Sequence, residues 1–243
     1  MDDDLCVRGS SAAELVRVAD GTRSAAGVEN IAALAEAVSR RVGSVRTAFV
    51  DVMGPTPLEV LAMVGGPTVL LPAFLASGYH VHQDIPQHIE LSGHPEVAVT
   101  QTLGPDPVLA TVMAERLREA GWRRGDAVVL AAAGSSDPRV RHEVHTAASM
   151  LARRTGPVKV GYIATGEPRV RDVVAELRGT GRRVFVASYL LAHGLFQQRL
   201  TEAGADGVAQ PLGVHPEIVN LMVRRFASAA VVADGLEAVA DIA

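Results

Sequence analysis

The sequence has little cysteine, few aromatic residues and no long apolar segment free of helix breakers. Cys6 is the only cysteine among 243 residues, which excludes an internal disulfide and a metal site built from several thiolates. Residues 60–83 carry no formal charge when histidine is counted neutral. They contain Gly-Gly-Pro at 65–67 and Pro72, however, and these would interrupt a membrane-spanning helix. The acidic N-terminus also lacks the apolar core of a secretory signal, so we expect a cytoplasmic protein without a membrane partner.

An excess of basic charge is also missing. The chain has 23 Lys and Arg against 27 Asp and Glu, a formal net charge of −4, which argues against a nucleic-acid partner. The "MVGGPT" turn at residues 63–68 lacks the GxGxxG spacing, so we expect no nucleotide cofactor. With 48% hydrophobic and 21% charged residues, the chain can bury a substantial core. Monomer and homodimer both remain open.

Strand-like apolar segments alternate with amphipathic helical patterns along the chain. In the first part, the strand patterns lie at residues 13–19, 45–52, 68–75 and 96–101. The helical patterns lie at residues 27–42, 55–64 and 105–121. This order predicts an α/β fold with parallel strands and helices on both faces of the sheet.

The pattern then starts again near Asp126, which indicates an internal duplication. The matched pairs, each separated by 113 positions, are Gly21 with Gly134, Ala48 with Gly161 and Pro55 with Pro168. Such a period is too long for a solenoid repeat. We therefore predict two similar parallel-sheet halves, residues 1–122 and residues 123–243, with a cleft between them.

Polar side chains follow three predicted strands of the first half, where ligands of open parallel sheets bind. These residues are Asp20, Asp51 and His80. Carboxylates and imidazole suit a divalent transition metal and also transfer protons. The matching residues of the second half are Ala133, Ala164 and Phe196. Because the second half has lost every one of these polar groups, we interpret them as a site that only the first half retains.

At these residues the sequence resembles the class II chelatases, specifically the sirohydrochlorin cobalt- and ferrochelatases of the long, two-half form. The resemblance covers residues 15–226 and is most specific in "GTR", "AFVDVMGPTPLEVL", "PAFLASGYHVHQDIP" and "ASYLLAHGLFQQRL". It implies a chelatase-like duplicated fold and a metal-ion lyase that inserts Co²⁺ or Fe²⁺ into sirohydrochlorin, toward cobalamin or sirohaem. The metal ion would be a substrate, with Ni²⁺ also open, and the tetrapyrrole the partner molecule.

In that family two histidines carry the site, one before G-[ST]-R and one in G-x-H-x-x-x-D-[IL]-P. The second motif is intact, so the resemblance assigns metal binding and proton acceptance to His80. Asp20 stands where the first histidine is expected, and Asp51 stands where the family commonly has an acidic residue. We therefore expect His80 and Asp20 to be catalytic and His80, Asp20 and Asp51 to bind the metal. A carboxylate with a reference pKa of about 3.9 accepts protons poorly at neutral pH unless desolvation raises that pKa.

The carboxylates of the tetrapyrrole need cationic or N–H partners. Arg23 is the expected partner because a guanidinium binds a carboxylate with two parallel hydrogen bonds, and the backbone of Gly21 and Thr22 offers further donors. Tyr79 and His82 flank His80 as further predicted substrate contacts. His82 would share the side of His80 in an extended segment and not in a helical one.

Two other interpretations remain open. Asp84 precedes Ile85-Pro86 and is interpreted as the cap of the following helix. The Asp20 substitution also fits a chelatase relative that binds metal or tetrapyrrole without turnover, or a chelatase for another metal or macrocycle.

Overall fold

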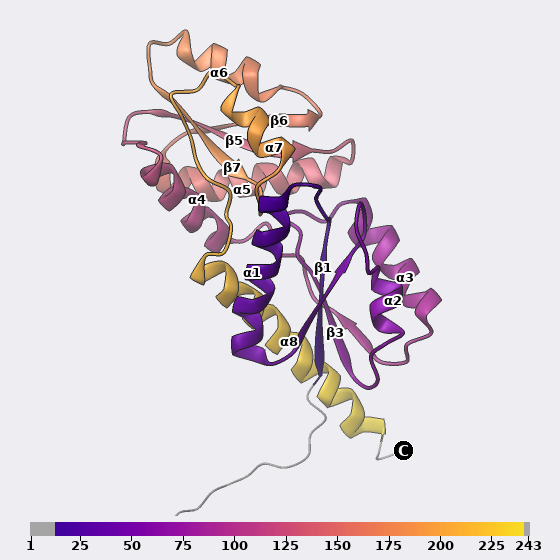
Figure 1. Ribbon diagram of the computed structural model, residues 1–243. Helices are drawn as coiled ribbons and strands as arrows, with labels where there is room; N and C mark the ends of the chain where they lie inside the picture. The colour runs from indigo at the N-terminus through magenta and orange to yellow at the C-terminus, as the bar shows by residue number, and fades with distance from the viewer. Residues whose placement is uncertain (1–12, 241–243) are drawn as a thin grey trace, which may run out of the picture.

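Two four-stranded parallel sheets form the framework of the computed structural model, which describes the backbone of residues 13–240 and the side chains of residues 13–230. The first sheet has the order β2-β1-β3-β4 and consists of β1 (Glu14–Ala19), β2 (Val45–Phe49), β3 (Thr68–Pro72) and β4 (Val97–Val99). The second has the order β6-β5-β7-β8 and consists of β5 (Ala127–Gly134), β6 (Val158–Thr165), β7 (Val184–Tyr189) and β8 (Gly207–Val208). The predicted pair of similar parallel-sheet halves is confirmed (Figure 1).

Helices cover both faces of each sheet. They are α1 (Ala25–Val42), α2 (Pro57–Leu61), α3 (Ile85–Ser92), α4 (Pro107–Glu119), α5 (Pro138–Thr155), α6 (Val170–Arg178), α7 (Leu195–Thr201) and α8 (Pro216–Ala240). In the first half, Val16 and Val18 face α2 and α3, while Leu15 faces α1. This alternation follows from the two-residue period of a strand and explains why every β1 residue after Glu14 is buried.

The two halves repeat details of their backbones. The N–H of Phe49 donates to the carbonyl of Pro55 at 2.8 Å, and the matched N–H of Tyr162 donates to Pro168 at 2.9 Å. Gly21 and its counterpart Gly134 both have positive φ, at 91° and 98°. A Cβ at either glycine would collide with the carbonyl oxygen of the neighbouring strand end, so glycine is required in both copies.

The helices that end each half are exchanged between the halves. Helix α4 packs against α5 and β7 of the second half, whereas α8 returns to pack on α1, β3 and β4 of the first. Figure 1 shows α8 running beside the sheet of the first half. One core cluster therefore extends from Leu15 through α4 and α8 to Leu130 of the second sheet. The boundary predicted at residues 122/123 lies between α4 and β5 along the chain, and this exchange ties the two segments together in space.

Within the described residues, no helix combines the length and the apolar character that crossing a membrane requires.

Candidate functional site

His80 lies beyond the end of β3 and opens a five-residue π-helix, η1 (His80–Asp84). The N–H of Ile85 donates to the carbonyl of His80, which closes the i→i+5 hydrogen bond that defines this helix. The wider turn gives the segment a local geometry that an ordinary α-helix would not have. Single π-turns of this kind occur frequently at functional sites.

The imidazole of His80 lies between two carboxylates. Its Nδ1 is 2.5 Å from Oδ2 of Asp84, and its Nε2 is 3.5 Å from Oδ1 of Asp20. An ionised carboxylate can only accept hydrogen bonds, so the Nδ1–H of His80 donates to Asp84 and leaves the lone pair on Nε2. The side chain of His80 is 35% exposed, so Nε2 is reachable from solvent.

Asp84 does not cap α3, and that interpretation was wrong. It precedes the helix with helical φ and ψ, and its side chain makes no capping hydrogen bond. A helical approach to α3 leaves no extended N-cap residue, so the carboxylate is free to turn back onto His80 four residues earlier.

Asp20 follows β1 directly, and its side chain is 66% exposed at the edge where the strands end. Desolvation by the surrounding protein raises the pKa of the Asp20 carboxyl, His80 opposes the rise, and Asp51 adds to it by a smaller amount. Solvent screening limits the size of this effect at an exposed side chain. A raised pKa makes the Asp20 carboxylate a better proton acceptor at neutral pH.

Asp51 lies next to Asp20, but its carboxylate accepts a hydrogen bond from the following residue. Its Oδ1 accepts the N–H of Val52 at 2.8 Å, and its carbonyl accepts the N–H of Met53 at 2.7 Å. Val52 has φ of 65°, a strained conformation for a β-branched residue. Within the part of the chain that the structure describes, no three or more His, Cys, Asp or Glu side chains are arranged to hold a metal ion together.

Gly21, Thr22 and Arg23 form the turn from β1 into α1. The hydroxyl oxygen of Thr22 accepts the N–H of Ser24 at 3.1 Å, and Ser24 in turn caps α1. The side chain of Arg23 is exposed, and among the described residues it has no hydrogen-bond or ion-pair partner. It is therefore available for a ligand at this edge.

Two aromatic rings, those of Phe74 and Tyr79, neighbour the imidazole of His80. Phe74 stacks with a centroid separation of 6.2 Å, and Tyr79 meets the imidazole edge-on at 6.0 Å while remaining 67% exposed. His82 is exposed, and the helical turn directs it away from the side of His80. Hydrogen bonds from Arg139 lower the pKa of the Asp137 carboxyl in the second half, and the nearby His82 makes the smallest contribution in the same direction.

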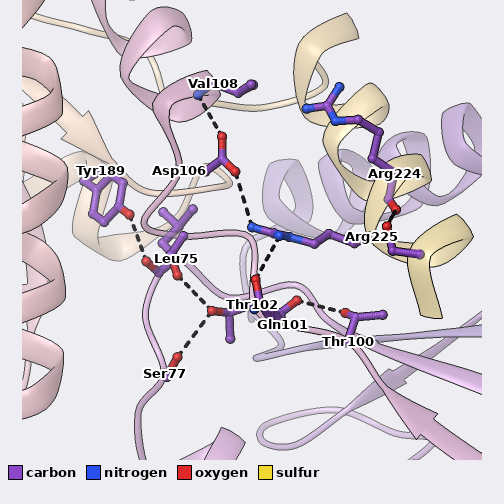
Figure 2. A network of polar contacts seen from close by, with 12 residues as sticks. Leu75, Ser77, Thr100, Gln101, Thr102, Asp106, Val108, Tyr189, Arg224 and Arg225 are labelled. Carbon is purple, nitrogen blue, oxygen red and sulfur yellow. Dashed lines mark hydrogen bonds and ion pairs between the residues drawn. The ribbon is translucent and has the colours of Figure 1, made fainter. Parts of the chain in front are cut away.

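The second half holds the segment that leads into His80. The hydroxyl of Tyr189 donates to the carbonyl of Leu75 at 2.8 Å (Figure 2). The N–H of Ser77 donates to Glu143 at 2.6 Å. A Cβ at Gly104 would lie 2.4 Å from the Tyr189 hydroxyl oxygen, so glycine is needed for this close approach.

The matched positions of the second half are apolar in the structure as well. Phe196 stands where His80 does, and Leu200, 1% exposed, stands where Asp84 does. Sequence reasoning missed the partnership of Asp84 with His80, although the i,i+4 spacing was visible. It also missed Glu143 and Tyr189, whose roles depend on contacts between distant segments.

Comparison with known proteins agrees with this architecture, which is that of the class II chelatases. The sequence model of the CbiX family matches residues 14–120 and again residues 127–229. The chain belongs to the CbiX family.

Individual relatives are similar at moderate identity. A sirohydrochlorin ferrochelatase of Priestia megaterium is 26% identical over 170 residues, which cover 63% of this chain and 64% of that relative. The structure of SirB from Bacillus subtilis with Fe³⁺ has a TM-score of 0.77 at 23% identity, covering 91% of this chain and 97% of that one. SirB from Bacillus subtilis subspecies spizizenii in complex with cobalt has a TM-score of 0.73 at 20% identity, and the match again covers 91% of this chain and 97% of that one.

Proposed function

We propose that this protein inserts a divalent metal ion, Co²⁺ or Fe²⁺, into sirohydrochlorin or a closely similar tetrapyrrole. The observation that carries the proposal is the arrangement of His80, with Nδ1 bound to Asp84 and Nε2 directed at Asp20. An imidazole held in this tautomer offers a single lone pair, which serves either a metal ion or a proton.

The distance between His80 and Asp20 suits two ligands of one metal ion. Ligand atoms about 2.1 Å from a tetrahedral ion lie about 3.4 Å apart. The observed separation of 3.5 Å between Nε2 and Oδ1 therefore matches the span of such a pair. Asp51 would join as a third ligand if its carboxylate turned from the N–H of Val52 toward Asp20. A site with few protein ligands keeps open positions from which the ion can pass to the macrocycle.

Metal insertion also requires that pyrrole N–H protons leave the macrocycle. Two protons leave for each divalent ion inserted. The Nε2 atom of His80 would accept them one at a time, and the imidazolium formed each time would be stabilised by both neighbouring carboxylates. Asp20, whose pKa desolvation raises against the opposing effect of His80, would relay each proton to solvent.

The surroundings of His80 suit a flat macrocycle with carboxylates on its periphery. Exposed apolar side chains lie on three segments around the strand ends, namely Val52 at 47%, Tyr79 at 67% and Leu195 at 59%. The segment before Leu195 borders Thr22, since a Cβ at Gly194 would lie 3.6 Å from the Thr22 hydroxyl oxygen. These side chains would contact the ring, while Arg23 and the N–H groups of Gly21 and Thr22 would bind its carboxylates.

The relatives support the reaction class and leave the metal open. The Priestia megaterium protein is a sirohydrochlorin ferrochelatase, and the two SirB structures contain Fe³⁺ and cobalt. Imidazole and carboxylate ligands accept both ions, so availability would decide between them.

The test is an anaerobic absorbance time course of sirohydrochlorin with Co²⁺ or Fe²⁺, with and without protein. We expect the protein to accelerate the shift to the metallated spectrum and His80→Ala to abolish that acceleration. The matched control is His142→Ala with His145→Ala, which removes an exposed histidine pair on α5 that could bind metal adventitiously. Binding of metal or tetrapyrrole without acceleration would refute turnover and favour a relative that only carries its ligand.

A further inference from the structure

A second concave surface lies far from His80, at the opposite end of α5. It has a volume of about 790 Å³, within the range of small-molecule sites. Helix α5 contacts the β3 loop through Glu143 and reaches this surface at Arg153, a rise of about 15 Å along the helix at 1.5 Å per residue. We call it the arginine pocket, and its lining is Arg118, Trp122, Arg123, Arg124, Ala152, Arg153, Arg154, Thr155 and Gly156.

The arginine pocket contains five arginines and no acidic residue in a protein whose net charge is −4. Several arginines outside the pocket pair with carboxylates, as Arg183 does with Asp126 and Arg225 with Asp106, while others, such as Arg23, stand singly. Among the described residues, by contrast, the guanidinium groups of four pocket arginines make no hydrogen bond and no ion pair. These are Arg118, Arg123, Arg124 and Arg153.

Helix capping accounts for only part of this cluster. Arg118 and Arg153 lie in the last turns of α4 and α5, where a cation interacts favourably with the helix dipole. Arg123 and Arg124 lie beyond the end of α4, in the link to β5, where this explanation does not apply. All four guanidinium groups are exposed, so solvent screens their mutual repulsion, and their N–H donors remain available to an anion.

The link that carries Arg123 and Arg124 is held in place. Trp122 is 7% exposed and belongs to the main core, directly before the two arginines. The N–H of Arg123 donates to Asp126 at 2.8 Å, and the N–H of Asp126 donates back to the carbonyl of Arg123 at 3.0 Å. The backbone is therefore ordered before any ligand arrives, which lowers the entropic cost of binding.

We propose that the arginine pocket is a binding site for a small polyanion that carries two or more phosphate or carboxylate groups. Guanidinium groups bind both kinds of oxyanion through paired, charge-assisted hydrogen bonds. The site is separate from the proposed metal insertion and does not depend on it.

The test is titration calorimetry with tripolyphosphate and with citrate, which represent phosphorylated and polycarboxylate ligands. We expect saturable binding of at least one of them, weakened by salt. Arg123→Gln with Arg153→Gln should lower the affinity at least about tenfold, since each charge-assisted bond contributes at least that factor. If the double variant does not fold, Arg124→Gln alone is titrated, and it should also lower the affinity for the anion.

The matched control is Arg171→Gln with Arg224→Gln, which removes two exposed arginines outside the pocket. This control and His80→Ala should both bind as the unmodified protein does. The proposal is overturned if neither anion binds saturably, or if the control loses as much affinity as the pocket variant.

Discussion

At the scale of single residues, the imidazole of His80 is oriented by one carboxylate and faces another. Asp84 and Asp20 differ in exposure, at 21% and 66%, and this difference separates their proposed roles. The more buried Asp84 positions the ring, whereas the more exposed Asp20 can meet a metal ion or a proton from solvent.

The first prediction concerns Asp20. Replacing it by histidine, Asp20→His, should raise the rate of metal insertion, because imidazole has a reference pKa of about 6.5 and accepts protons better at neutral pH. The rate of sirohydrochlorin metalation with Co²⁺ measures the change. An unchanged or lower rate would show that the carboxylate is suited to this site.

The second prediction concerns Asp84. Asp84→Asn keeps the shape of the side chain but removes the charge that fixes the His80 tautomer, so metal affinity should fall by about 10–100-fold. Titration with Co²⁺ measures the affinity, and thermal unfolding checks the fold. Glu90→Gln, an exposed acidic residue on α3, is the matched control and should bind metal normally.

At the scale of elements, β1 joins the site to the core. Its C-terminal end presents Asp20, while its middle residue Arg17 is 1% exposed. Arg17 donates to the hydroxyl of Thr47 at 3.1 Å, and its Nε has no partner among the described residues. Burial lowers the pKa of Arg17 to about 10, so the folded protein bears a cost for keeping this group charged. The matched residue of β5 is Leu130, which is fully buried.

The third prediction is that Arg17→Leu increases the free energy of unfolding at neutral pH by about 1–3 kcal/mol. The folded state binds the Arg17 proton less tightly than the unfolded state, so the cost declines as pH rises above about 10 and the gain should shrink there. Urea unfolding at neutral and alkaline pH measures both effects. Arg17→Lys keeps a buried charge and should give no stabilisation.

At the scale of the whole molecule, the second half supports the site without contributing charged groups at the matched strand ends. Glu143 and Tyr189 hold the loop before His80, and the exchange of α4 and α8 merges the two cores. Duplication therefore produced one half that presents polar side chains and another that fixes their position.

The fourth prediction concerns this support. Tyr189→Phe leaves the Leu75 carbonyl without its donor and should lower the free energy of unfolding by about 1–2 kcal/mol. Burial, with Glu143 and Asp106, raises the pKa of the Tyr189 hydroxyl, so the unfolded state releases its proton first. Stability from Tyr189 is thus present below about pH 10 and is lost as pH rises further. Urea unfolding of both proteins should show the difference narrowing above that pH, and a constant difference would contradict it.

The sequence by itself determined the strand and helix order, the duplication and the polar residues at the strand ends. These features follow from local hydrophobic periodicity and from the geometry of parallel strands, both of which act over short stretches. Gly21 and Gly134 could be paired for the same reason, since each is needed by its own turn.

Only the tertiary structure decided which groups complete the site. The π-turn that brings Asp84 onto His80 depends on how β3 meets α3, and the interpretation of Asp84 as a cap failed because it considered α3 alone. The contacts of Glu143 and Tyr189 join segments 66 and 114 positions apart, and no local pattern encodes them. The return of α8 to the first sheet likewise depends on which apolar faces remain uncovered once both sheets have formed.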